Sequence, residues 1–130
     1  MPSANAETVD RTAFDAPSNF VRADVAGAEE VAPGIRRQLL GFGDALMGAR
    51  VWFSTGAVGE LHAHPHAQMS YVESGEFKVT VGAEQQTLSA GDSFFVPSQS
   101  RHGAVCLQAG VLIDVFAPAR EDFIPARGEV

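Results

Sequence analysis

Apolar and polar residues alternate with a period of two in much of the chain after residue 35, which is the pattern of half-buried β-strands. Residues 77–81 alternate strictly between two glycine-containing turns. Residues 35–42 and 46–54 are rich in apolar side chains and predict a hairpin. Further short strands are expected at residues 86–88, 93–96, 104–107 and 111–116. Turn residues recur between these segments and no helical period is sustained, so the sequence predicts an all-β sandwich or barrel.

One domain is expected, because 130 residues suffice for a single core and are few for two typical domains. The 13 glycines and 7 prolines favour short elements joined by turns. Residues 23–130 form the predicted barrel domain. Residues 1–22 are polar and irregular, and two interpretations stay open for them: a mobile tail, or an arm that adds a strand to a partner subunit.

Charge and cysteine content narrow the classes of partner and compartment. The net charge of −7 comes without a cluster of Lys or Arg, which argues against a nucleic-acid partner. No stretch approaches the ~18 apolar residues of a membrane-spanning helix, so no membrane association is expected. Cys106 is the only cysteine and cannot form an intramolecular disulfide. Together with the lack of a signal-peptide pattern, this leads us to expect a cytoplasmic protein.

Three of the four histidines lie within five residues, at His62, His64 and His66. On a strand, His62 and His64 would project from one face and could chelate one cation. Gln68 has the same parity, although we expect Pro65 to bend the strand. A solvated loop of histidines is the alternative for this segment taken alone.

A second segment, residues 91–102, contains a turn, a buried strand that ends at a proline, and then a histidine. Together the two segments resemble the two sequence motifs of the cupin family. The first motif is matched, gaps included, by Gly56, His62, His64, Gln68 and Gly75. The second is matched by Gly91, Pro97 and His102. It departs from the pattern at Gln99, where a glycine is usual, and at Cys106, where an asparagine is usual.

The resemblance implies a cupin double-stranded β-helix, which is a jelly-roll barrel, with one divalent metal ion on His62, His64, Gln68 and His102. Most cupins have a glutamate at the position of Gln68. A neutral amide leaves the full positive charge on the ion and makes it a stronger Lewis acid. Imidazole and amide ligands suit Ni, Zn, Fe, Mn and Co alike. His66 has no place in the motif and is expected to line the pocket or the surface.

A narrower resemblance, to the pectin-degradation cupins, covers roughly residues 30–124. It is carried by residues 62–68, 70–75, 91–93 and, most specifically, 114–123. Members of this family convert 4,5-unsaturated uronic acid monosaccharides, released from pectin or alginate, to the linear keto form. The resemblance therefore implies an enzyme in which Asp114 moves a proton, Arg120 holds the substrate carboxylate and Phe116 packs against the sugar.

The residues around Asp114 support a pocket independently of the resemblance. A period of two places Leu112, Asp114 and Phe116 on one face of their strand. A carboxylate in an apolar strand is costly to bury unpaired. Either it pairs for structural reasons with Arg50, Arg101 or Arg120, or it is a functional acid–base group with a pKa tuned by burial.

Two other functions remain open at this point. One is another metal-dependent cupin enzyme, such as a dioxygenase, and the other is a non-catalytic sugar-binding cupin. In each case the expected partner is a small molecule, an anionic sugar in the reading favoured here. A homodimer is also expected, since cupin sheets commonly pair through an outer face.

Overall fold

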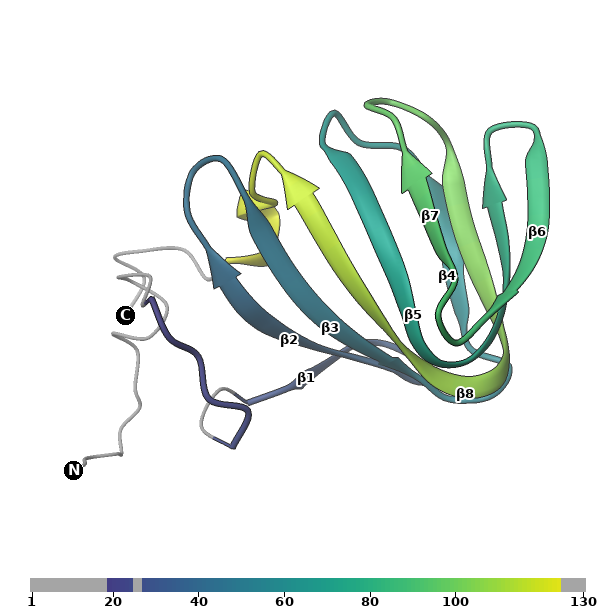
Figure 1. Cartoon of the computed structure of the whole chain (residues 1–130), viewed down its shortest axis with the longest axis horizontal. Coiled ribbons are helices and arrows are strands. Elements are labelled where there is room, and N and C mark those ends of the chain that lie inside the picture. The colour runs from purple at the N-terminus through teal and green to yellow at the C-terminus, as the bar shows by residue number, and fades with distance from the viewer. Residues whose placement is uncertain (1–18, 25–26, 125–130) are drawn as a thin grey trace.

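The computed structural model describes residues 19–24 and 27–124, and this part of the chain is almost entirely β-structure (Figure 1). The predicted all-β class is confirmed. The elements are β1 (Glu29–Ala32), β2 (Ile35–Phe42), β3 (Met47–Phe53), β4 (Val58–His62), β5 (Ala67–Val81), β6 (Glu84–Ser89), β7 (Ser93–Val96), β8 (His102–Ala117) and the short 3-10 helix η1 (Glu121–Phe123). No helix in the described ranges is long and apolar enough to cross a membrane.

Strands β5 and β8 organise the barrel, because each is long enough to belong to both of its halves. They pair antiparallel along their length, from Ala67 opposite Ala117 to Val81 opposite His102. One half of the barrel continues through β3, β2 and β1 on the side of β8 and through β7 on the side of β5; the other half continues through β4 and β6. Figure 1 shows both long strands curving from one half to the other. The two halves enclose the core and the pocket.

The bend in the two long strands lies where Gly75 meets Gly110. The pairing register shifts between Ser74 and Glu76, so the strands change direction together. Gly75 has a φ of 86°, a left-handed conformation that favours glycine. A Cβ on Gly75 would also lie 2.6 Å from the carbonyl oxygen of Gln108, which is closer than packed atoms approach. The bend therefore depends on two residues without side chains.

The core follows the alternation predicted from the sequence. The inward-facing side chains of β3 are buried: Met47, Ala49, Val51 and Phe53. The residues between them are only half-buried and face outward, including Arg50 and Trp52. Strands β2 and β3 form the expected antiparallel hairpin. On the inner side, the Phe53 and Phe77 rings meet edge to face at 5.2 Å between centroids.

Two details of the sequence prediction are corrected by the structure. The strands expected at residues 104–107 and 111–116 are parts of the single strand β8, because pairing continues through the residues between them: Gln108 pairs with Glu76 of β5 and Gly110 with Phe53 of β3. The strand expected to carry His62 and His64 ends at His62.

The division into a tail at residues 1–22 and a domain at 23–130 stays a prediction, since residues 1–18 lie outside the described part. Where the description begins, the chain runs against β2: the side-chain amide of Gln38 donates a hydrogen bond to the carbonyl of Ala23 over 3.1 Å.

Candidate metal centre and pocket

Three histidines from separate parts of the chain meet inside the barrel. His62 ends β4, His102 begins β8, and the two lie opposite each other in the pairing of these strands. His64 reaches them from the loop after β4. One nitrogen from each ring lies within 4.8 Å of the other two, close enough for all three to bind one metal ion. The structure thus brings together the three predicted histidine ligands.

The loop that carries His64 is fixed by the second motif. Residues 63–66 are not strand, because Pro65 cannot donate to a ladder, so parity along a strand is not what aligns His64 with His62. Instead, the Gln99 backbone N–H donates to the His64 carbonyl over 2.7 Å. Gln99 has a φ of 68°, in the left-handed region that favours glycine. This explains why a glycine is usual at this position and shows that glutamine can replace it.

The ring orientation of each histidine is set by a backbone carbonyl two residues away. In all three rings Nδ1 lies at hydrogen-bonding distance from a carbonyl oxygen, which can only accept. The carbonyls are those of Glu60 for His62 (2.8 Å), His66 for His64 (2.9 Å) and Ser100 for His102 (2.9 Å). Each Nδ1 therefore carries the hydrogen and each Nε2 of a neutral ring keeps its lone pair. Burial lowers the pKa of His64 and of His102, which favours this neutral form.

Gln68 is oriented by a chain of buried hydrogen bonds. Its amide nitrogen donates to the Ser70 hydroxyl over 2.9 Å, and this hydroxyl donates to the Asp114 carboxylate over 2.6 Å. The amide oxygen must then point the other way, and it lies 3.1 Å from Nε2 of His64. The fourth predicted ligand thus presents its oxygen to the histidine cluster.

The donor atoms fit a metal ion. Nε2 of His64 and Oε1 of Gln68 are both acceptors in this arrangement, so a cation or a proton between them is needed to satisfy both. Nε2 of His102 is buried and has no hydrogen-bond partner among the described residues. Buried polar atoms are rarely left unpaired, and a metal ion would remove this penalty. These residues could hold one metal ion, and their donor types leave its identity open.

His66 lies beside the cluster, with its ring centroid 5.4 Å from that of His64. Its side chain is buried, and its Nε2 lies 3.2 Å from a carboxylate oxygen of Glu121 in η1. Its backbone carbonyl is the acceptor that orients His64. His66 therefore links the loop of the candidate ligands to the C-terminal segment that closes the pocket.

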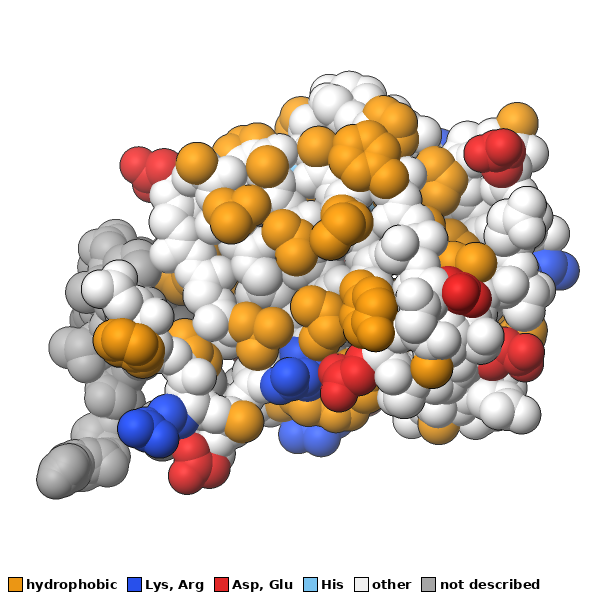
Figure 2. All heavy atoms as spheres, viewed as in Figure 1, with side chains coloured by type: hydrophobic (Ala, Val, Ile, Leu, Met, Phe, Trp, Pro, Cys, Tyr) orange, Lys and Arg blue, Asp and Glu red, His pale blue; other side chains and the backbone are white. Residues whose placement is uncertain are grey.

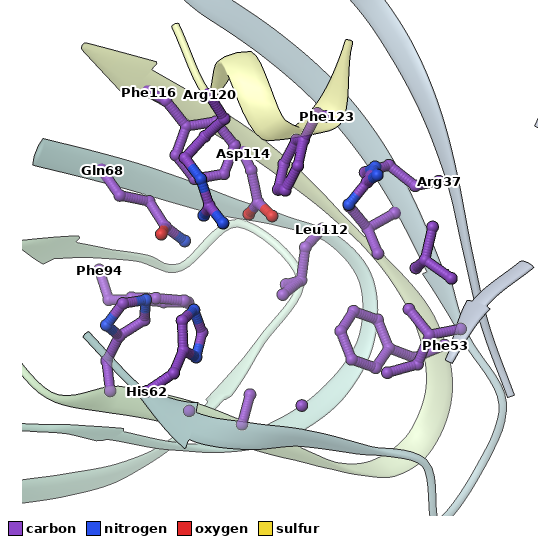
Figure 3. A pocket seen from close by; sticks show the side chains of 17 residues that line it. Arg37, Phe53, His62, Gln68, Phe94, Leu112, Asp114, Phe116, Arg120 and Phe123 are labelled. Carbon is purple, nitrogen blue, oxygen red and sulfur yellow. The ribbon is translucent and has the colours of Figure 1, made fainter. Parts of the chain in front are cut away.

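A cavity of about 280 Å³ lies next to the histidines (Figure 3). Its wall combines candidate metal ligands, a carboxyl group, cationic side chains and aromatic rings. The residues of its wall used below are His62, Gln68, His102, Arg37, Phe94, Asp114, Phe116, Arg120 and Phe123. The three residues predicted to be catalytic, Asp114, Phe116 and Arg120, thus share one cavity with three of the four predicted ligands, and their roles stay predictions.

Asp114 is held between β5 and β8 without an ion pair to any described residue. Its partner is Ser70, directly opposite it in the strand pairing. Burial raises the pKa of Asp114 to about 6, against the opposing effects of the Ser70 hydrogen bond and the positive charges of Arg37 and Arg120. A carboxyl group with such a pKa can both give and take a proton near neutral pH.

The structure gives Arg120 a fixed position. Its guanidinium donates to both carboxylate oxygens of Asp122, over 3.0 and 2.8 Å. It also lies over the rings of Phe116 and Phe123, at 5.4 and 4.3 Å from their centroids. Arg50 was an alternative partner for Asp114. It forms an ion pair with Glu73 instead, at 3.5 Å.

Several residues of the wall were not predicted from the sequence. Arg37 could have been found, because a period of two places it on the same face of β2 as buried Ile35. Phe94 and Phe123 carry no signal that separates a pocket ring from a core ring. Ser70 does not line the cavity, and its link to Asp114, which lies 44 positions away in sequence, became visible only in the structure.

Comparison with known proteins supports this description of the fold. Residues 49–116 match the family model of the cupin domain. The chain is 41% identical over 98 residues to the pectin degradation protein KdgF of Dickeya dadantii (strain 3937), a match that covers 74% of this chain and 89% of that protein.

Two solved structures resemble this one over most of its length. A RmlC-like cupin from Shewanella frigidimarina NCIMB 400 has a TM-score of 0.81 and 50% identity, covering 83% of this chain and 98% of that chain. KdgF from Halomonas sp. has a TM-score of 0.79 and 39% identity, covering 82% of this chain and 100% of that chain. The predicted cupin fold and the resemblance to the pectin-degradation cupins are thereby confirmed. This chain belongs to the cupin family and is related to the pectin degradation protein KdgF.

Proposed function

We propose that this protein converts 4,5-unsaturated uronic acid monosaccharides into their linear keto form with one bound divalent metal ion. One observation carries the proposal: candidate metal ligands and Asp114 line the same cavity, in a chain related to a pectin degradation protein. The cavity of about 280 Å³ lies just below the usual range of about 300–1,000 Å³ for ligand pockets, which suits a ligand as small as a single sugar ring.

The reaction is an isomerisation and needs only proton transfer. The C1 hydroxyl of the cyclic substrate loses a proton, the bond between C1 and the ring oxygen breaks, and C4 gains a proton. A bound metal ion supplies polarisation of substrate oxygens. Asp114 takes the hydroxyl proton and returns a proton to C4, a role that its raised pKa supports.

The remaining predicted residues bind and enclose the sugar. Arg120 directs positive charge into the cavity toward the substrate carboxylate, and Asp122 keeps its guanidinium in place. Phe116 is buried and presents its ring to the cavity, where it packs against the sugar and excludes water.

The substitution Asp114→Asn tests the proposal. It keeps the shape and the acceptor for Ser70 but cannot take up the proton. We expect the rate of loss of the ultraviolet absorbance of 4,5-unsaturated galacturonate to fall by roughly 10²- to 10⁴-fold, with metal content unchanged. Asp44→Asn, in an exposed loop, is the matched control and should keep wild-type activity.

The outcomes separate the competing functions. Full activity of the Asp114→Asn protein would show that Asp114 is not the proton carrier. Wild-type protein with about one metal ion per chain and no turnover would exclude this substrate. Oxygen uptake in that case would point to a dioxygenase, and saturable sugar binding without turnover would point to a binding protein. Chelation of the metal should abolish activity, and one divalent ion should restore it.

A further inference from the structure

Arg37 is a cationic residue of the cavity wall to which the sequence motifs assign no role. It lies on β2, on the face that points into the barrel, and its side chain is half-buried. Figure 3 shows its guanidinium on the far side of Phe123 from Arg120. Its guanidinium carbon lies 3.5 Å from the centroid of the Phe123 ring, compared with 4.3 Å for Arg120. Phe123 is thus stacked between two arginines.

The two arginines differ in how their charge is balanced. Arg120 uses two of its five donors on the oxygens of Asp122, whose negative charge lies directly against its own. The Arg37 guanidinium forms no hydrogen bond or ion pair with any described residue. Its partner in the strand pairing, Glu29, attracts it electrostatically without coming into ion-pair contact. Arg37 therefore brings to the cavity a planar set of donors that the described protein leaves unused.

We propose that Arg37 is the principal anion-binding residue of this cavity, and that it takes the carboxylate of a sugar acid. The identity of the sugar rests on the proposed function, whereas the anion subsite rests on the geometry alone. A guanidinium binds a carboxylate through two parallel hydrogen bonds, and stacking on Phe123 holds its plane for this contact. Arg120 adds positive charge from the other side of the ring.

The electrostatics of the cavity agree with this assignment. Burial lowers the pKa of Arg37, and the charge of Arg120 lowers it further, against the attraction of Glu29, Asp122 and Asp114. The positive charge of Arg37 is thus held where solvation is poor. A bound carboxylate would restore the solvation that the guanidinium has lost.

The substitution Arg37→Gln tests the subsite in the metal-loaded protein by calorimetric binding of two sugars. Galacturonate and galactose differ only at C6, where one has a carboxylate and the other a hydroxymethyl group. We expect Arg37→Gln to weaken galacturonate binding by about 10- to 100-fold and to leave galactose binding and metal content unchanged. Arg36→Gln is the matched control, since Arg36 is exposed and lies 5.8 Å from the Trp52 ring. It should bind both sugars like wild type.

Failure of the subsite and failure of the proposed reaction give different results. Arg37-dependent preference for galacturonate, with no turnover of unsaturated galacturonate, would leave the subsite in place and remove the reaction. Wild-type protein that does not prefer galacturonate to galactose, or an Arg37→Gln protein that retains the preference, would overturn the subsite. If Arg37→Gln does not fold, Arg37→Lys serves instead, because it keeps the positive charge but lacks the planar fork of donors. We expect its affinity for galacturonate to be several-fold lower than that of wild type. Wild-type affinity in this variant would overturn the proposal.

Discussion

Ser70 illustrates how a single buried hydroxyl can orient the groups of the candidate metal centre. It accepts a hydrogen bond from Gln68 and donates one to Asp114, so its one hydrogen is already used. A glutamate at position 68 could not donate to Ser70, and two carboxylates would then compete for the same hydrogen. The unusual glutamine is therefore consistent with the nearby Asp114, which needs the Ser70 hydrogen. The ligand and the carboxyl group must be considered as one unit.

Removing this hydroxyl should loosen the candidate ligand. Ser70→Ala leaves the Gln68 amide nitrogen without its acceptor, so the amide oxygen is no longer directed at the histidines. We expect the affinity for a divalent ion to fall by roughly 10-fold, as is usual when a group that orients a ligand is lost. Titration of metal-free protein with Zn²⁺ measures this. Ser93→Ala, at an exposed position on β7, is the control, and an unchanged affinity in Ser70→Ala would refute this role.

At the scale of elements, the site depends on the register between β5 and β8. Ser70 lies opposite Asp114 and Gln68 lies opposite Phe116, so a slip of one residue would separate the hydrogen-bonded chain. The bend at Gly75 and Gly110 interrupts this pairing midway. It lets the first half of β8 carry His102 toward β4 while the second half carries Asp114 into the cavity.

A side chain at the bend should therefore destabilise the whole barrel. A Cβ on Gly110 would lie 2.6 Å from Gly75 Cα, and the backbone of the facing strand has no room to move away. We expect Gly110→Ala to lower the free energy of unfolding by roughly 3 kcal/mol. Urea unfolding checks this against Gly43→Ala, where a Cβ meets nothing within 4 Å. Equal stability of the two variants would mean that the bend adapts.

The sequence was sufficient to predict most of the strands and part of the candidate site, and the reasons are physical. Alternation along a strand is local, so it placed Leu112, Asp114 and Phe116 together correctly. Pairing between distant strands is not local, so Ser70 could not be linked to Asp114 in advance. His64 was assigned to the right cluster through a motif, although the strand geometry first used for it was wrong. Arg37 was missed because the periodicity of β2 was used only to locate the hairpin.

For the whole molecule, the buried carboxyl of Asp114 links stability to pH. Its pKa in the folded protein is about 6, above the 3.8 of an exposed carboxyl. A raised pKa means that the protonated group favours folding, so this contribution is full below pH 3.8 and is lost as the pH rises through about 6.

We therefore expect metal-free Asp114→Asn and wild-type protein to have similar stability near pH 4. Near pH 7 the variant should be more stable, by at most about 3 kcal/mol, because wild type must then bury a charge. Urea unfolding of both proteins at the two pH values measures the difference. The same stability gap at both pH values would show that Asp114 does not titrate in this range.

The outer surface of the molecule carries large apolar side chains that are exposed and take no part in the core. Met69, Tyr71 and Phe95 are each more than 40% exposed, and Met69 lies opposite Phe95 in the pairing of β5 with β7. Figure 2 shows apolar side chains gathered across one face of the molecule. Such a face favours contact with another protein surface. The homodimer expected from the sequence stays a prediction, and this face is the one we would assign to it.

The pairing of β5 with β8 also suggests an order for the folding of the barrel. It can begin at Val81 and His102, which are 21 positions apart, and extend to Ala67 and Ala117, which are 50 positions apart. His62 and His102 come together only when β4 has docked on β8. The three candidate ligands are therefore assembled only after this docking, and we expect an ion bound there to slow unfolding more than it speeds folding.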